Sequence, residues 1–419
     1  MLVYRVLAVW LIMAEEWDKS IRIYLIDYGL ELSCGHHFSG ASVLHSSAEE
    51  MGAKLLALAP RTGSFPQNEA PEILPILSHG QYDTALAINT SCNDFISAFN
   101  TRRTAVYRDL AGWLSDRIFK EDVALLSTPL TPELVGFTDW YESIPMCQRP
   151  SVAVHFVLPI EFELAPNAAW QRIFANKMHS ESISRLRTLS LGRNFFACHD
   201  ARLAQSLSSP GHSLDVHPVP TEILVRNPSK DFCIGVLGQA RLEKGLDLAI
   251  ATVKLLRQYS SYKWVIQTAP MELGDCTLHL REENIKRIAH LPANDEYRNI
   301  LSTLSVMLLP YDPISYDNFR SSNMFIEAVA CGIPVICSDT DFFVEELNKL
   351  GCPELIFRPY TPEALAVKIR HVAAEYPKYE RLFAANSHEF NLKERAKQFV
   401  TQLIRIRQTG PYNYSKSEA

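Results

Sequence analysis

Residues 316–339 read YDNFRSSNMFIEAVACGIPVICSD, a polar stretch that runs directly into an apolar segment. Cap-type residues at 320–323 precede the apolar run, as they do at the start of a helix. Gly332 then marks the end of the helix, Pro334 prevents its continuation, and 335–337 form a short apolar strand. The stretch therefore predicts a loop, helix and strand unit of the α/β kind, around which the rest of the chain can be organised.

The start of this helix is suited to an anion, because backbone N–H groups at a helix N-terminus are unpaired and carry partial positive charge. We expect Ser321, Ser322 and Asn323 to hold a phosphate through the backbone, and Arg320 to add a bidentate contact. Glu327 lies on the same helix face as Asn323 and offers an acceptor for a sugar hydroxyl. An ordinary capped helix explains these residues equally well when they are taken alone.

The segment resembles the donor-binding signature of the GT-B glycosyltransferases, especially the GT4-like group (glycosyltransferase group 1). Members carry the pattern E-A-x-A-x-G-x-P-V, and residues 327–335 read EAVACGIPV. The resemblance implies that Glu327 binds the ribose of a nucleotide sugar. Members usually have a second glutamate earlier in the loop, where this chain has Phe319. This departure leaves the identity of the sugar and the stereochemical outcome open.

A second motif, GQARLEKG at 238–245, follows an apolar strand and precedes a helical stretch. The turn at Gly238, the cations Arg241 and Lys244, and a helix N-terminus can together neutralise a diphosphate without a metal ion. The spacing is neither that of a Walker loop nor that of a dinucleotide-binding fingerprint. A solvated, charged helix start remains an alternative for this segment alone. The motif resembles the G-x-x-R-x-E-K-G donor-phosphate segment of GT-B transferases, which implies that Arg241 and Lys244 act on the diphosphate as catalytic cations.

The first half of the chain alternates apolar strands with helical stretches, which indicates a parallel sheet. The expected strands include 21–26, 54–59, 82–88, 123–128, 151–158 and one from 194. Ligands bind beyond the carboxyl ends of such strands, so the loop Gly35-His36-His37 after the first strand is a candidate donor-binding loop. The resemblance implies contact with the sugar and diphosphate. A surface loop with two solvated histidines is the alternative.

His155 lies inside the strand SVAVHFVL at 151–158. A histidine in a buried strand is commonly a core residue with its hydrogen bonds satisfied. The strand resembles one in the acceptor domain of GT4-like enzymes, whose terminal histidine faces the donor sugar, so we predict His155 as a catalytic contact. By the same resemblance, LPANDEY at 291–297 lies where the family holds the nucleoside base.

The 419 residues are enough for two domains with separate cores. The predicted fold is α/β, with two Rossmann-like domains of doubly wound parallel sheet that face each other across a cleft, the GT-B architecture. The expected boundaries are an extension at 1–20, an acceptor-binding domain at 21–220, a donor-binding domain at 221–390, a helix at 391–408 that crosses back to the first domain, and a frayed tail at 409–419. The proline-containing segment VHPVPTE at 216–222 is the expected connection.

The composition of the chain argues against some functions and predicts the compartment in which the protein resides. A net charge of −6 and a pI of about 6.1 argue against a nucleic-acid binder with a broad basic face. The nine cysteines have no metal-ligand spacing, so we expect reduced, mostly buried thiols in a cytoplasmic protein and no metal site. The apolar start, 1–13, is shorter than the ~20 residues of a membrane span. A signal peptide, or a true start at Met13, are the alternatives there.

The resemblance to GT-B transferases implies a glycosyltransferase (EC 2.4, hexosyltransferase type) that needs no cofactor or metal and uses a UDP- or GDP-sugar as donor. The acceptor would be a hydroxyl of a glycan or a lipid-linked glycan in surface polysaccharide or glycoconjugate synthesis. GT4-like enzymes retain the anomeric configuration. Several cations within 393–407 keep peripheral contact with the inner membrane face open. The oligomeric state is left open. The alternatives are a catalytically silent GT-B protein that binds a nucleotide sugar or glycan, and a sugar-nucleotide epimerase of the same shape.

Overall fold

The computed structural model describes residues 21–32, 35–65, 71–81, 91–160, 164, 169–208, 214–218, 226–259, 261–269, 284–290, 292, 294–316, 320–390 and 392–408. The chain divides into two compact units. Unit 1 comprises Met1–Ser33, His37–Pro218 and Ala396–Ala419, and unit 2 comprises Cys34–His36 and Val219–Arg395. The predicted strand at 82–88 and the position of Phe319 lie outside the described residues.

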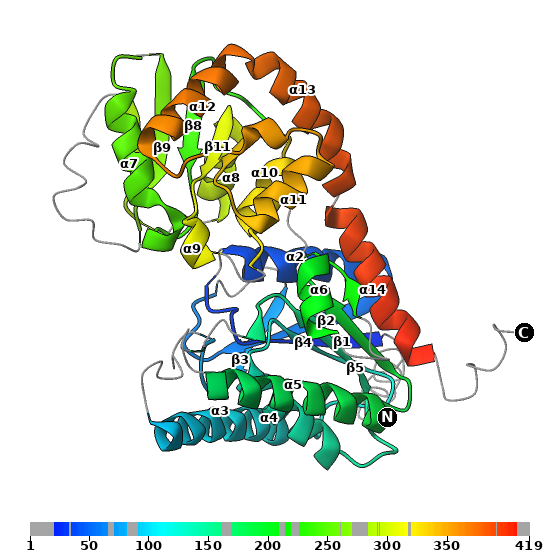
Figure 1. Ribbon diagram of the computed structural model, residues 1–419. Coiled ribbons are helices and arrows are strands. Elements are labelled where there is room, and N and C mark those ends of the chain that lie inside the picture. The colour runs from blue at the N-terminus through cyan, green and yellow to red at the C-terminus, as the bar shows by residue number, and fades with distance from the viewer. Residues whose placement is uncertain are drawn as a thin grey trace, which may run out of the picture. The chain divides into compact units, whose positions relative to one another are not determined.

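Unit 1 is built on a seven-stranded sheet in the order β3-β2-β1-β4-β5-β6-β7, and every neighbouring pair is parallel (Figure 1). Its strands are β1 (Ile21–Asp27), β2 (Ala53–Pro60), β3 (Glu72–Leu77), β4 (Val123–Ser127), β5 (Ser151–Phe156), β6 (Asn194–Cys198) and β7 (Asp215–Val216). The order reverses between β1 and β4. This is the doubly wound arrangement that was predicted from the strand and helix alternation.

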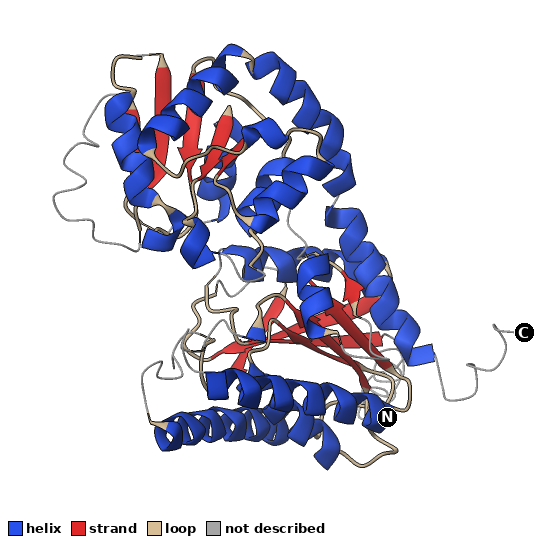
Figure 2. Cartoon of the chain, viewed as in Figure 1, coloured by secondary structure: helices blue, strands red, loops and turns tan. Residues whose placement is uncertain are grey.

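Helices cover both faces of this sheet, as the alternation of side chains along β1 requires (Figure 2). Tyr24 and Ile26 pack in one cluster with helices α3, α4 and α5, whereas Ile23 and Leu25 pack in another with α2 and α14. The helices are α2 (Gly35–Glu50), α3 (Cys92–Trp113), α4 (Thr131–Ser143), α5 (Ala169–Ser190), α6 (Ala201–Leu207) and α14 (Leu392–Gln408). The end of the chain thus supplies part of the core of unit 1.

Unit 2 contains a five-stranded parallel sheet in the order β10-β9-β8-β11-β12. Its strands are β8 (Phe232–Val236), β9 (Tyr262–Gln267), β10 (Ile285–Ile288), β11 (Val306–Leu309) and β12 (Val335–Cys337). Its helices are η2 (Leu242–Lys244), α7 (Leu246–Leu255), α8 (Asn294–Thr303), α9 (Pro313–Tyr316), α10 (Asn323–Ala330), α11 (Asp341–Lys349), η4 (Pro353–Leu355), α12 (Pro362–Ala374), α13 (Tyr376–Asn386) and η5 (Ser387–Phe390). The strand order reverses between β8 and β11, where a ligand crevice is expected.

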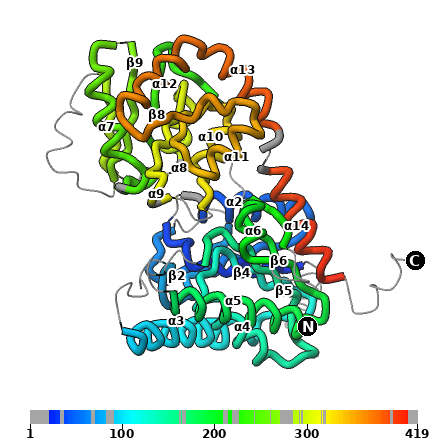
Figure 3. The backbone as a smooth tube through the Cα atoms, in the orientation of Figure 1, coloured from blue at the N-terminus to red at the C-terminus, as the bar shows by residue number. Residues whose placement is uncertain are grey.

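The opening stretch of the sequence forms α10 and β12, which lie in the yellow-orange part of the tube in Figure 3. Ser322 caps the helix, and Gly332 follows it with φ +66°. The N–H of Ile333 returns to the carbonyl of Ala328 at 2.8 Å, which satisfies an orphan carbonyl at the helix end. The predicted loop, helix and strand unit is therefore confirmed, and so is the fold class of two parallel α/β sheets.

One local prediction is wrong. Gly35, His36 and His37 form the first turn of α2 and not a loop. His37 Nδ1 lies 3.0 Å from Oδ2 of Asp27, at the end of β1. This tertiary contact links the start of α2 to the end of β1, and the local sequence pattern does not predict it.

Candidate functional site

The predicted donor residues of unit 2 gather at the carboxyl ends of β8 and β11, where the strand order reverses. Gly238 follows β8 with φ +98°, and its N–H donates to Oε1 of Gln267 on β9 at 3.0 Å. A Cβ at this position would lie 3.3 Å from the side chain of Met324 and 3.4 Å from Nζ of Lys244. The backbone conformation therefore favours glycine here, whereas a Cβ would require only a small shift of the Met324 side chain.

Lys244 ends the 3₁₀ turn η2, directly before Gly245. Gly245 has φ +70°, and an added Cβ would lie 1.8 Å from the carbonyl oxygen of Pro310. This glycine lets the chain turn tightly beside β11, and it brings Nζ of Lys244 to 5.8 Å from the centre of the Tyr311 ring. Burial lowers the pKa of Lys244 to about 8, Arg241 acts in the same direction, and Glu243 and Glu327 oppose them. The ammonium is thus the prevailing form at neutral pH.

Arg241 is the more accessible cation, with a side chain that is 39% exposed. Its Nη2 donates to Oε1 of Gln239 at 2.9 Å, and its Nη1 lies 3.6 Å from Oε1 of Glu243. An exposed ion pair of this kind is weak and can rearrange at low cost. Arg241 is therefore able to turn towards an incoming anion beside Lys244.

The loop before α10 is held by two tyrosine rings, Tyr311 and Tyr316, whose centroids are 4.3 Å apart. The hydroxyl of Tyr316 donates to the carbonyl of Ser321 at 3.1 Å, and the guanidinium of Arg320 lies 5.6 Å from the Tyr316 ring. Ser322 is buried, and its hydroxyl accepts from the N–H of Phe325 at 3.2 Å. The Ser322 side chain thus caps α10, which leaves the backbone of the loop as the group that can meet a ligand.

Glu327 lies one turn into α10 and is half-buried. The hydroxyl of Tyr297, on α8, donates to its Oε2 at 2.5 Å. Burial raises the pKa of the Glu327 carboxyl to about 7, whereas the hydrogen bond from Tyr297 and the charge of Lys244 lower it. Within unit 2, Tyr297 thus contacts both Glu327 and Met324, and the side chains of Met324 and Lys244 both border the point that a Cβ of Gly238 would occupy.

His155 lies on β5 in unit 1 and is buried. Its Nε2 is 2.6 Å from the carbonyl oxygen of His217, so this nitrogen carries a proton and donates. The ring also lies 5.3 Å from that of Phe399, on α14. Burial lowers the pKa of His155 to about 3, so the imidazole is neutral at physiological pH. A catalytic contact by His155 stays a prediction, since these contacts are those of a well-packed core residue.

Sequence reasoning missed the aromatic and sulfur-containing members of the site, which are Tyr297, Tyr311 and Met324. Tyr297 is the last residue of the segment predicted to hold a nucleoside base, and that resemblance was the one available signal. The hydroxyls of Tyr297 and Tyr311 meet Glu327 and Ser322 only through tertiary contacts.

The prediction of a site without metal relied in part on the expectation that the chain has no D-x-D motif. That expectation is wrong, because Asp339-Thr340-Asp341 has this spacing. In the structure Asp339 accepts a hydrogen bond from Nη2 of Arg358 at 2.5 Å, and Thr340 caps α11 by accepting from the N–H of Phe343. Asp341 lies in the first turn of that helix. Each member thus has a local structural role. In the part of the chain that the structure describes, no cluster of three or more His, Cys, Asp or Glu is placed to hold a metal ion.

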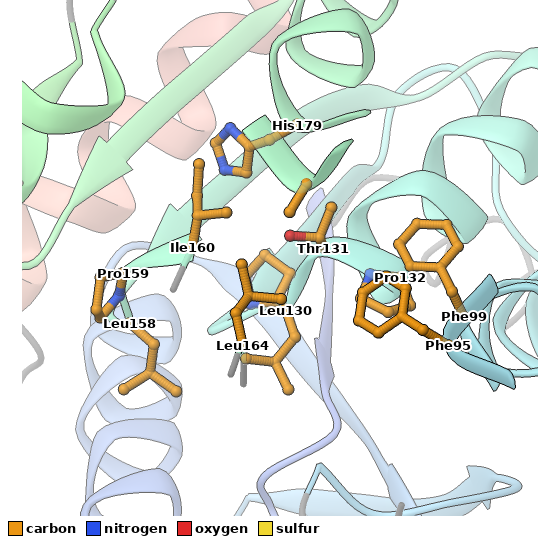
Figure 4. A pocket seen from close by; sticks show the side chains of 12 residues that line it. Phe95, Phe99, Leu130, Thr131, Pro132, Leu158, Pro159, Ile160, Leu164 and His179 are labelled. Carbon is orange, nitrogen blue, oxygen red and sulfur yellow. The ribbon is translucent and has the colours of Figure 1, made fainter. Parts of the chain in front are cut away.

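Two hollows lie away from these residues. One, of about 10 Å³, sits in unit 1 beyond β4 and β5, among apolar side chains such as Phe95 and Leu130, with Thr131 and His179 as polar members (Figure 4). It has room for about one water molecule. The other, of about 720 Å³, lies between α11 and α12 in unit 2. Neither is lined by a predicted donor residue. Among helices of the described residues, none has the length and apolar character of a membrane span.

Residues 224–388 match the family model for glycosyl transferases group 1. No curated protein sequence matches the chain. Among solved structures, the N-terminal domain of Candida albicans trehalose-6-phosphate phosphatase is 12% identical with a TM-score of 0.60, over 92% of this chain and 97% of that one.

A structure described as trehalose-6-phosphate from E. coli bound with UDP-2-fluoro glucose is 11% identical with a TM-score of 0.58, over 92% of this chain and 99% of that one. The UDP-GlcNAc 2-epimerase from Neisseria meningitidis, bound to UDP-GlcNAc, is 14% identical with a TM-score of 0.54, over 92% and 100%. At these identities the likeness is one of fold, and the GT-B architecture predicted from the sequence is confirmed.

Proposed function

We propose that this chain transfers a sugar from a nucleoside diphosphate sugar to an acceptor hydroxyl, because residues 224–388 match the family model for glycosyl transferases group 1. The observation that carries the proposal is the meeting of a charged lysine, a left-handed glycine turn and a carboxylate at the switch point of the unit 2 sheet. Nζ of Lys244 lies 3.4 Å from the point that a Cβ of Gly238 would occupy, and Glu327 acts on the same ammonium.

Lys244 and Arg241 would neutralise the diphosphate as the bond from the anomeric carbon to the leaving oxygen breaks. Negative charge builds on that oxygen in the transition state, and preorganised cations in a half-buried site stabilise it strongly. Lys244 is held by packing against Tyr311, whereas Arg241 is the adaptable partner. With two cations in place, the chemistry requires no divalent metal ion.

Glu327 would accept hydrogen bonds from the ribose hydroxyls, and the backbone N–H groups of residues 320–323 would receive a phosphate or the donor sugar. The side chain of Ser322 is excluded from this role because it caps α10. Unit 1 would bind the acceptor, a glycan or a lipid-linked glycan. From the resemblance alone, His155, Gly35, His36 and His37 are proposed contacts of the donor sugar. The anomeric configuration would be retained. We place the reaction in the cytoplasm or on the inner membrane face, in surface polysaccharide or glycoconjugate synthesis.

Phe319 favours a second candidate, a silent protein that binds a nucleotide sugar without transferring it, because the family usually has a glutamate there. The structural similarity to a UDP-GlcNAc 2-epimerase suggests a third candidate, a sugar-nucleotide epimerase. All three would bind the same donor through Lys244 and Glu327. They differ in the fate of the sugar.

The test is a release assay with UDP-glucose, UDP-galactose, UDP-GlcNAc and GDP-mannose, with and without glycan acceptors. Slow release of UDP or GDP from one donor, abolished by Lys244→Met and preserved in the surface variant Lys349→Met, supports the transferase. Binding of a donor without release under every condition indicates the silent protein. Conversion of the donor sugar to its epimer in the absence of acceptor indicates the epimerase. Absence of binding to all four donors contradicts the proposal itself.

A further inference from the structure

Tyr297 makes a contact that neither sequence motif contains. It stands on α8, and its hydroxyl donates to Oε2 of Glu327 on α10 at 2.5 Å. The hydroxyl oxygen of Tyr297 also lies 3.4 Å from the sulfur of Met324, whose side chain borders the Gly238 turn. The phenol thus touches both the carboxylate assigned to the ribose and the edge of the phosphate turn.

The carboxylate of Glu327 has two neighbours that favour its charged form, the Tyr297 hydroxyl on α8 and the Lys244 ammonium on η2. Arg241 acts on this pair through Lys244. The phenol of Tyr297 is faced in turn by Cys331, at the end of α10, and by Tyr311, after β11. A carboxylate accepts about four hydrogen bonds, so the one from Tyr297 leaves room for two ribose hydroxyls.

We propose that Tyr297 is a positioning residue of the donor site, whose hydroxyl holds the Glu327 carboxylate in the orientation that receives the 2′- and 3′-hydroxyls of a ribonucleoside diphosphate. The inference rests on the proposed function. Without the Tyr297 hydroxyl, the Glu327 side chain can adopt more rotamers. Binding of the ribose must then also offset the conformational entropy that is lost when the carboxylate is ordered. Tyr297 therefore contributes to selection of a ribose over a sugar without these hydroxyls.

The test is Tyr297→Phe, which removes one oxygen atom and keeps the ring. A matched control exists in the same unit, since Tyr376 also donates to a carboxylate, Oε1 of Glu380, at 2.7 Å. Binding of UDP, GDP and ADP is measured by calorimetry from pH 6 to pH 9, and the nucleotide that binds best is compared with its 2′,3′-dideoxy form. Thermal unfolding of each variant reports whether the fold is preserved.

We expect Tyr297→Phe to weaken binding of the ribonucleotide about three- to tenfold, as for the loss of one hydrogen bond, and to leave binding of the dideoxy form unchanged. Since the Tyr297 hydroxyl favours ionised Glu327, its removal also raises the pH below which affinity is lost, by about half a unit to one unit. Tyr376→Phe should change neither quantity. A purely structural role for Tyr297 would lower both affinities equally and leave the pH dependence in place.

Two negative results are distinguishable. If the unaltered protein binds a ribonucleotide and Tyr297→Phe binds it with the same affinity and pH dependence, the positioning role is refuted and the proposed function stands. If the unaltered protein binds none of the three nucleotides, the proposed function fails and the inference fails with it.

Discussion

Replacing Lys244 by methionine should weaken the binding of a nucleoside diphosphate about ten- to a hundredfold at pH 7.5. A hydrogen bond to a charged group contributes about 1.5–3 kcal/mol, which corresponds to this range. Methionine keeps an apolar stem of similar length beside the Tyr311 ring, so the change removes charge with little loss of packing. The expected loss is therefore electrostatic and should leave stability nearly unchanged.

The pH dependence gives the prediction its second part. The pKa of Lys244 is lowered to about 8 by burial, so its charge is present below that pH and is lost as the pH rises through it. The pKa of Glu327 is raised to about 7, so its charge is present above that pH and is lost as the pH falls through it. Affinity in the unaltered protein should thus be greatest between about pH 7 and pH 8. Lys244→Met should abolish the fall on the alkaline side, and it should move the acidic fall to higher pH, because Glu327 loses a charge that favours its ionised form.

The assay is calorimetric titration with UDP or GDP from pH 6 to pH 9.5, with Lys349→Met as control. Lys349 is an exposed residue of α11 paired with Glu345 and Glu346, so its removal should change affinity less than twofold. Affinity that is unchanged in Lys244→Met at pH 7.5 would remove Lys244 from the phosphate site. An alkaline fall that persists in the variant would refute the assignment of that titration to Lys244.

Two further predictions concern stability and are read from urea unfolding. Gly245→Ala should destabilise unit 2 by about 3 kcal/mol or more, because φ is +70° and the new Cβ would lie 1.8 Å from a carbonyl oxygen. The control Gly351→Ala, with φ +73° and open space around the new Cβ, should cost only about 1–2 kcal/mol. Equal losses of stability in the two variants would show that the close approach at Gly245 does not matter. Glu133→Ala should cost about 3–5 kcal/mol of stability, because it leaves the buried guanidinium of Arg102 without its carboxylate partner. The control Glu142→Ala removes a carboxylate from an exposed ion pair and should cost less than about 1 kcal/mol. A small loss of stability in Glu133→Ala would contradict a buried ion pair.

The helices and turns of unit 2 were predictable from the sequence wherever neighbouring residues determine them. Ser322, Gly332 and Pro334 fix the start and the end of α10 through capping and backbone conformation, which a sequence displays directly. The spacing of Arg241 and Lys244 before a helix is local in the same sense. These elements were therefore found in the right places without any knowledge of their partners.

Elements that depend on distant partners were not found. The strand β3 contains Pro75, which argues against a strand, and it forms because it lies at the edge of the sheet, where one side needs no ladder hydrogen bonds. The turn at Gly35 was mistaken for a loop because the contact from His37 to Asp27 is invisible locally. The hydrogen bond from Tyr297 to Glu327 joins α8 to α10, which are separated along the chain by β11 and α9, and no periodicity could pair them.

Lys244 and Glu327 depend on each other in a way that explains why the site tolerates burial of both. Burial alone would favour a neutral lysine and a neutral glutamic acid, and each charge opposes that tendency in the other. The hydroxyl of Tyr297 acts in the same direction on the carboxylate, whereas Arg241 opposes the lysine charge. An arriving diphosphate would offset the repulsion between the two cations, and ribose hydroxyls would stabilise the carboxylate. A donor bound as proposed would therefore prefer the doubly charged form, and its binding would widen the pH range over which that form persists.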